Sequence, residues 1–231
     1  MMGQIYSNSL FTLIAEDASD VHGGLLRRRP AFEYPLRPLS FDFTPRSCDF
    51  DKEPRFHNAV SRSPLRQRGW TLQERIMSTR TLHISAIGMF WNCVELAASE
   101  HHPTRTSAED IADLGQYIFY PRMRCRWNRS QNRDELIRMW MDIVRELNTR
   151  RFTVATDKLP ALSGVARAFY NDYSSDDQYL GGMWESMLPN TLLWSTRPSP
   201  TTSVPSQRWR ERIPGIPTWS CLSITSPFLF E

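Results

Sequence analysis

The chain has 231 residues, enough for one domain with a sizeable core or for one domain with an appendage. Hydrophobic residues make up 40% of it and aromatic residues 12%, a composition that excludes intrinsic disorder. The formal net charge of +3 is small, and arginines are interleaved with acidic residues along the chain. We therefore expect no nucleic-acid partner, because no basic surface is indicated.

The cysteines and the apolar runs indicate where the protein resides. Cys48, Cys93, Cys125 and Cys221 are far apart and form no Cys-x-x-Cys pair, and no signal peptide is recognisable. Free thiols in a reducing compartment fit this pattern, so we expect a cytoplasmic protein. The longest apolar run, residues 10–15, is much shorter than the about 20 residues that cross a bilayer, so no membrane span is expected.

The first part of the chain predicts one strand followed by irregular structure. Residues 10–15 form a continuous apolar run, which is typical of a strand buried on both faces in a parallel sheet. Residues 27–68 contain six prolines, which exclude a long helix. The three arginines at 27–29 could contact phosphate, but a solvated loop is the simpler interpretation.

The densest stretch of informative residues is Arg68-Gly69-Trp70 and the helical turn after it. Gln73, Glu74 and Arg75 follow at spacings that place them next to Trp70 on a short helix. Gly69 would let the backbone enter this turn from an unusual conformation.

A β-hairpin is predicted to follow this helix. Residues 81–84 alternate between polar and apolar, residues 89–91 are strand-like, and Ala86-Ile87-Gly88 would form the connection. We expect Trp70 to be buried against this hairpin, and residues 10–15 to lie in the same sheet.

The second half of the chain predicts helices. Asn132 can cap a helix over residues 132–149, with Glu135 completing a capping box. An apolar stripe runs along one side of this helix, formed by Leu136, Trp140, Ile143 and Leu147. The outward-facing residues are Arg138, Asp142 and Arg145. A second helix begins near residue 156 or 157, with Pro160 in its first turn.

The remaining segments give weaker signals. Residues 179–187 and 188–194 are interpreted as two short helices, the first weakened by Gly181-Gly182. Residues 198–205 are a linker rich in proline, serine and threonine, and residues 219–224 favour β structure.

Four pieces follow one another in the sequence: Arg68-Gly-Trp-Thr-Leu-Gln-Glu-Arg75, Ser78-x-Arg80-x-Leu82-His83, Phe90-Trp91-x-Cys93 and Ser99-Glu100. In this order they resemble the closing motif of the fungal heterokaryon incompatibility (HET) domain. The resemblance continues with Asp157-Lys-Leu-Pro-Ala-Leu-Ser-Gly164, Tyr179-Leu-Gly-Gly-Met-Trp184, Leu193-Trp194 and Pro217-Thr-Trp-Ser220. Two earlier family motifs have no counterpart here, so the resemblance implies a fragment lacking the N-terminal part of the domain. The motif residues are Arg68, Gly69, Trp70, Gln73, Glu74, Arg75, Leu82, His83, Phe90, Trp91, Cys93 and Glu100.

This resemblance implies a mixed α/β fold. We expect a partial TIR-like, doubly wound sheet with a β-hairpin, then a mainly helical region and a short C-terminal β segment. The corresponding divisions are residues 1–100, the C-terminal part of a HET domain; residues 101–195, a helical region; and residues 196–231, a linker and the start of a truncated β region.

The resemblance also implies a function in nonself recognition and programmed cell death, through protein partners or self-association. There are two alternatives: a TIR-like hydrolase that cleaves NAD(P), or an inactive truncated gene product. Whether the chain is an enzyme therefore stays open. Glu74 and Glu100 are the candidate catalytic residues, although Glu74 also suits a salt bridge or cap that fixes the turn. No cofactor is expected, with NAD conceivable only as a substrate.

No metal site is expected either. His101 and His102 follow Cys93 and Glu100, but the spacing matches no structural zinc pattern. Cys93 itself is interpreted as a core residue rather than a nucleophile.

Overall fold

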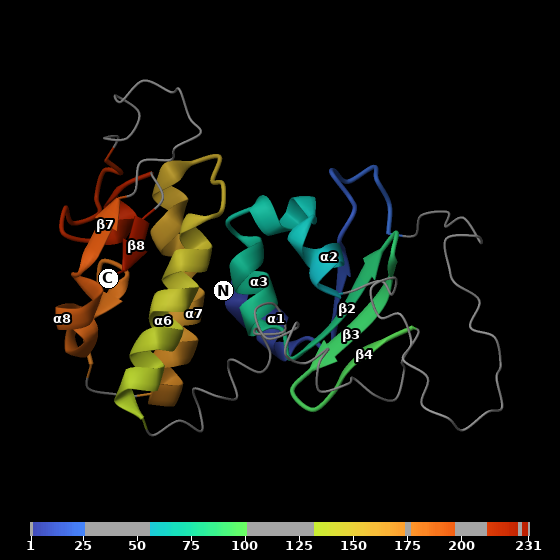
Figure 1. Ribbon diagram of the computed structural model, residues 1–231, viewed down its shortest axis with the longest axis horizontal. Coiled ribbons are helices and arrows are strands. Elements are labelled where there is room, and N and C mark those ends of the chain that lie inside the picture. Colours follow the sequence, from blue (N-terminus) through green and yellow to red (C-terminus); the bar gives the residue numbers. More distant parts are fainter. Residues whose placement is uncertain are drawn as a thin grey trace, which may run out of the picture.

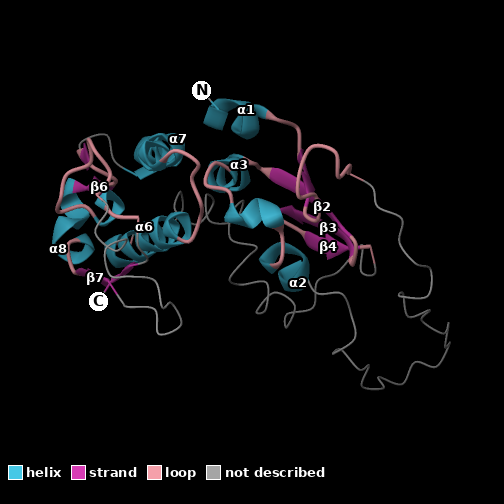
Figure 2. Cartoon of the chain, turned by 90° about the horizontal axis from the view of Figure 1, so that it is seen from above, coloured by secondary structure: helices cyan, strands magenta, loops and turns pink. Residues whose placement is uncertain are grey.

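The computed structural model describes residues 2–25, 56–100, 132–173, 177–196, 212–225 and 228–230. Within them, a four-stranded sheet with three short helices is followed by two long helices and two small β-ribbons (Figure 1). Figure 2 shows the long helices between the C-terminal ribbons on one side and the sheet with its short helices on the other. The mixed α/β class expected from the sequence is confirmed.

The main sheet has the strand order β1 (Thr12–Ala15), β2 (Arg80–Ser85), β3 (Gly88–Cys93) and β4 (Ala97–Ser99). β1 runs parallel to β2, and the other neighbours are antiparallel. The predicted hairpin is therefore confirmed as β2 and β3, and the predicted first strand lies in the same sheet. With one parallel pair among the described strands, the TIR-like, doubly wound arrangement stays a prediction.

The first strand was expected to be buried on both faces, and this is wrong. β1 lies at the end of the described strand order, and its alternating burial shows that only one of its faces is covered. Ile14 is 7% exposed on the inner face, whereas Leu13 is 48% exposed on the outer face. The apolar run also begins before the strand, because Leu10 and Phe11 precede Thr12 and are exposed.

The short helices lie on the side of the sheet that faces the long helices (Figure 2). They are α1 (Met2–Asn8), α2 (Phe56–Ser61), the 3-10 turn η3 (Pro64–Gln67) and α3 (Thr71–Met77). α2 forms a small apolar core with the sheet, made of Phe56, Ala59, Val60, Phe90 and Ala97. The helical turn expected after Trp70 is confirmed as α3, which ends where Ser78 takes up an extended conformation.

The two long helices confirm the sequence prediction closely. α6 (Arg133–Asn148) begins at Asn132, whose side chain accepts the backbone N–H of Asp134 at 3.0 Å. The 3-10 turn η5 (Ala155–Asp157) leads into α7 (Lys158–Tyr173), with Pro160 in the first turn. The predicted stripe of α6 is buried throughout: Leu136, Trp140, Ile143 and Leu147.

The helix predicted over residues 179–187 is wrong. β5 (Tyr179–Leu180) and β6 (Met183–Trp184) form a tight hairpin, and the 3-10 turn η6 (Glu185–Met187) follows. Gly181 and Gly182 have φ of 57° and 98°, the positive values at both central residues that such a two-residue turn requires. The Gly-Gly pair is therefore the turn of a hairpin and not a weak point of a helix.

The last segments are also shorter than predicted. α8 (Leu188–Thr191) ends before Trp194, which begins β7 (Trp194–Thr196) paired with β8 (Phe228–Phe230). A 3-10 turn, η8 (Cys221–Ser223), occupies half of the stretch predicted as β, and Ile224 forms only an isolated bridge. The arginine triplet at 27–29, Cys48, His101, His102, Cys125 and the linker at 198–205 lie outside the described residues.

One continuous apolar core joins the sheet region to the long helices. Leu72, Ile76 and Met77 of α3 belong to the same buried cluster as Trp140, Val144 and Leu147 of α6 and Leu162, Val165 and Phe169 of α7. α3 thus packs on α1 and on α7. The predicted divisions at residues 100 and 195 stay predictions.

Gly69 is a point of close backbone contact between the two regions. Its N–H donates to the carbonyl of Arg151 at 2.9 Å, and a Cβ at this position would lie 2.1 Å from Cε1 of Phe152. Gly69 is not among the glycines with positive φ, so the expectation of an unusual backbone conformation is wrong. Glycine is required here because the Phe152 ring lies against the backbone.

We expect Gly69→Ala to lower the free energy of unfolding by about 1–3 kcal/mol, the usual cost of overpacking. Urea denaturation would measure the loss. In a Phe152→Ala background the ring is gone, and the same Gly69→Ala change should cost much less. Equal losses in both backgrounds would contradict this account of Gly69.

Candidate functional site

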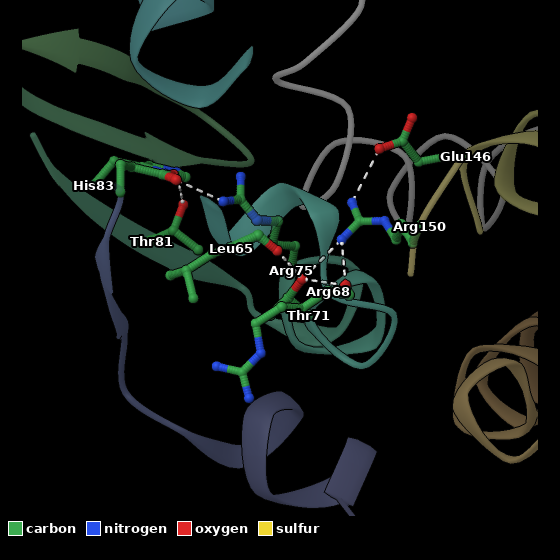
Figure 3. A network of polar contacts seen from close by, with 9 residues as sticks. Leu65, Arg68, Thr71, Arg75, Thr81, His83, Glu146 and Arg150 are labelled. Atoms are coloured by element: carbon green, nitrogen blue, oxygen red, sulfur yellow. Dashed lines mark hydrogen bonds and ion pairs between the residues drawn. The ribbon is translucent and has the colours of Figure 1, made fainter. Parts of the chain in front are cut away.

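α3 lies between two networks of polar side chains, and Figure 3 shows both. The first connects Arg75 to His83 and Thr81 on β2, and the second connects Thr71 to Arg150 at the end of α6. Both begin on residues of the short helix that follows Gly69-Trp70. The helix is therefore held by polar contacts toward the sheet and toward the long helices.

The first network is a buried triad of charged and polar groups. Glu16 follows β1 directly and is 0% exposed. Its backbone N–H continues the β1–β2 pairing to the Ile84 carbonyl at 2.9 Å. Its Oε2 accepts an N–H of Arg75 at 2.7 Å, and its Oε1 lies 2.6 Å from Nδ1 of His83. Arg75 and His83 are each 3% exposed.

The surroundings of His83 favour a neutral ring. Nδ1 faces the Glu16 carboxylate, so the tautomer that fits has its proton there, and Nε2 lies 2.9 Å from the Thr81 hydroxyl oxygen. Burial lowers the pKa of His83, and the nearby Arg75 charge lowers it further, against the opposing effect of Glu16. The Phe56 ring packs edge-on against the imidazole at 4.7 Å between centroids.

The carboxylate of Glu16 is held in its charged form. Burial alone would raise its pKa, but the hydrogen bond with His83 and the charge of Arg75 together lower it. Glu16 and Arg75 therefore form an internal ion pair between the end of β1 and α3, and His83 adds β2 to it.

The order of groups resembles a proton relay, with a carboxylate, an imidazole and a hydroxyl in line. Thr81 is only 2% exposed, however, and its oxygen also lies 3.3 Å from the carbonyl of Asn92 inside the sheet. A small cavity of about 10 Å³ near Asp17 and Ser85 holds at most one water molecule. We infer that these residues connect β1, β2 and α3 structurally.

The second network fixes the other side of α3. The Thr71 hydroxyl lies 2.6 Å from the Leu65 carbonyl and accepts an N–H of Arg150 at 2.8 Å. Arg150 also donates to the Arg68 carbonyl at 3.2 Å and pairs with Glu146 at 3.0 Å. The side chain of Arg150 is fully buried, so the end of α6 is anchored on the start of α3.

Trp70 and Gln73 connect the same motif to α7. Trp70 is half-buried, and its indole N–H donates to Asp157 at 3.3 Å, so the prediction that it packs on the hairpin is wrong. Gln73 is 3% exposed, and Cβ atoms at Gly3 and Gly164 would lie 2.9 Å and 1.6 Å from its Nε2. This amide is enclosed between α1 and α7.

The two candidate catalytic glutamates lie in different surroundings and outside the buried triad. Glu74 is half-buried beside Tyr6 of α1; partial burial, followed by the charge and hydrogen bonding of Glu74, raises the pKa of Tyr6 to about 12. Glu100 follows β4, and its backbone N–H donates to the Met89 carbonyl at 2.9 Å. Its carboxylate lies near Gly88 at the start of β3.

The other motif residues are distributed over the sheet. Phe90 is buried under α2, whereas Leu82 and Trp91 are half-buried on the opposite face. The free thiol of Cys93 is half-buried and accepts the Leu96 N–H at 3.3 Å in the β3–β4 turn. Arg68 is exposed, and its backbone pairs with Arg151.

Sequence reasoning selected Arg75 and His83 but missed the residues that connect them to their surroundings. Glu16 was not selected as a functional residue, and only its position directly after an apolar strand could have marked it as a buried acid. Arg150 sits just past the end of an amphipathic helix, where a basic residue is usually solvated. Neither position carries a local pattern that identifies a distant partner.

The fold and these networks define a mixed α/β module whose motif residues hold it together internally. The family described as Heterokaryon incompatibility protein (HET) matches residues 1–74 of the chain. This part of the chain, which includes β1, Glu16, α2 and the start of α3, is thus similar to the HET family. No curated protein and no solved structure gave a match. The resemblance beyond Glu74 rests on the motif residues alone.

Two further searches concern the described part of the chain only. There, no three histidine, cysteine or acidic side chains are grouped so that they could hold a metal ion. None of the described helices has the length and apolar character to cross a bilayer.

We expect Glu16→Gln to lower the free energy of unfolding by about 3–5 kcal/mol, because the change leaves Arg75 charged, buried and unpaired. Chemical denaturation would measure the loss. The matched control is Asp142→Asn, which removes an exposed pair with Arg145 of 2.8 Å, close to the 2.7 Å of the buried pair, and should cost about 1 kcal/mol or less. Similar losses for the two variants would contradict a structural role for the buried pair.

Stability should also fall with acidification. The pKa of His83 is lowered from 6.5 in the folded chain, so its contribution is complete above that value and is lost as the pH drops below it. The lowered pKa of Glu16 adds a second loss as the pH falls below 4.5. Unfolding free energies measured from about pH 7.5 to 3 would show both. The loss of stability between about pH 6.5 and 5 should be absent in the His83→Gln variant. If this loss persisted in the variant, a group other than His83 would be responsible for it.

Proposed function

We propose that this chain acts in fungal nonself recognition and that its activation leads to programmed cell death. We further propose that it acts in the cytoplasm through association with protein partners or with itself, rather than through catalysis. The HET match over residues 1–74 supports the recognition role. The observation that carries the mode of action is the use of Arg75, His83 and Thr71 in buried contacts.

Those contacts make α3 a suitable coupling element. One end of the helix is bonded to Arg150 of the helical region, and Arg75, one turn later, is bonded to Glu16 of the sheet region. If the sheet region displaced α3, the buried contacts between α3 and the helical region would have to break or form again. The same holds for a displacement of α3 by the helical region. Packed elements held in this way switch between discrete arrangements rather than deform gradually. A partner bound to the sheet region could thus change the helical region.

In this proposal, residues 1–100 form the HET part, residues 101–195 the helical part that responds to it, and residues 196–231 a linker and a short β segment. Glu74 would then act as a structural side chain beside Tyr6, not as a catalyst. Under this proposal, conservative changes at Glu74 or Glu100 that leave the fold intact should not remove activity. Under the catalytic alternative, NAD cleavage through Glu74 or Glu100, the same changes should abolish it.

The test is inducible expression of the full chain in a filamentous fungus, with growth and cellular NAD as readouts. We expect growth arrest by the wild type, with NAD falling no faster than in a matched culture arrested by other means. Arg150→Met should abolish the arrest because it removes the contact with Thr71, and Thr71→Ser, which retains a hydroxyl, should not. Protein levels and melting curves of each variant would separate loss of signalling from loss of folding.

Two outcomes would contradict the proposal. If Glu74→Gln or Glu100→Gln abolished both the arrest and NAD loss without changing the melting curve, the chain would be an enzyme. If the folded wild type caused no arrest at any expression level, the interpretation as an inactive product would be favoured instead.

A further inference from the structure

The open edge of β1 is the most apolar exposed part of the described sheet region. Leu13 on the strand is 48% exposed, Phe11 and Leu10 just before it are 43% and 75% exposed, and Ile5 of α1 is 69% exposed. Among the described strands, β1 is bonded only to β2. Its other side therefore faces away from the sheet.

The backbone of β1 shows which residues could bond to another strand. Glu16 donates its backbone N–H to the Ile84 carbonyl of β2, and the parallel register pairs Ala15 with Ile84 and Leu13 with Leu82. Because backbone groups of successive residues point to opposite sides of a strand, even-numbered residues face β2 here. The N–H and C=O groups of Phe11, Leu13 and Ala15 therefore point toward the open edge.

This edge also lacks the usual protection against self-pairing. Natural proteins place charged residues on edge strands so that two copies repel each other. Residues 2–15, which include all of α1 and β1, contain no charged side chain and no proline. Two copies brought together about a two-fold axis would meet no like-charge repulsion here, which favours a second copy of this chain over a charged partner strand.

We propose that two copies of the chain pair antiparallel through β1, forming one continuous sheet across a two-fold axis. The register follows from the backbone: Leu13 lies opposite Leu13 of the second copy, and Phe11 lies opposite Ala15. This pairing joins the outward-pointing backbone groups and brings the exposed side chains of these residues onto a common face. It deepens the proposed function, on which its biological role rests, by naming the surface of self-association.

The pairing is expected to be weak and dependent on concentration. β1 has four residues, and only a few side chains flank it, so the interface is smaller than the about 1,200–2,000 Å² typical of stable complexes. Weak association suits a signal that responds to the local concentration of the chain. Monomer and dimer should therefore coexist in solution in the micromolar range.

The register is tested by cross-linking of the full chain. A hydrogen-bonded antiparallel pair has Cα atoms about 5.5 Å apart, within the range that a disulfide spans. Under mild oxidation Leu13→Cys should therefore form a covalent dimer. The matched control Leu193→Cys, at a position 57% exposed and remote from β1, should form no more dimer than the oxidised wild type, which carries the native cysteines.

The pairing itself is tested by sedimentation over a range of concentrations. Leu13→Lys places two like charges opposite each other and should weaken dimerisation at least about tenfold, whereas Leu193→Lys should not. A wild type that stays monomeric up to about 100 µM, or a Leu13→Cys variant that cross-links no more than Leu193→Cys, would overturn the proposal. Growth arrest by a monomeric chain would overturn the pairing and leave the proposed function. A chain that forms the dimer but causes no growth arrest would support the pairing and contradict the proposed function.

Discussion

The buried ion pair between Glu16 and Arg75 is the interaction on which the described sheet region depends most. Water cannot compensate for the loss of either charge, because neither side chain is appreciably exposed. The pair constrains the end of β1, the middle of α3 and, through His83, the centre of β2 at once. An apolar contact could hold the same elements together, but it would tolerate sliding, whereas a paired carboxylate fixes register and orientation.

The same short helix carries the connection to the rest of the chain. Leu72 and Ile76 are completely buried in the core shared with the long helices, while Thr71 and Trp70 make polar contacts with Arg150 and Asp157. The sequence pieces that define the resemblance are therefore neighbours in space. A similar relation holds farther along, where the Ser220 hydroxyl donates to the Gly181 carbonyl and the Trp194 indole donates to the Trp219 carbonyl.

Periodic patterns predicted the elements, and long-range contacts decided what the patterns could not. α6, α7 and the β2–β3 hairpin followed from apolar spacing and a helix cap. The hairpin at Gly181-Gly182 was missed because apolar residues around it also fit a helix, and only the positive φ of both glycines separates the two. Glu16 was missed because a buried acid is identified by its partners, which lie 59 and 67 positions away in sequence.

The position of Gln73 between Gly3 and Gly164 has a consequence for how this sequence can diverge. The amide occupies the space that a side chain at either glycine would need, so three residues on three helices share one small volume. A homologue that gains a methyl group at either glycine must shorten residue 73 in compensation. The contact itself places no such constraint on the number of residues between these positions, because lengthening a loop costs little free energy. Substitutions at the three sites should consequently be correlated across related sequences, while the intervening segments vary in length.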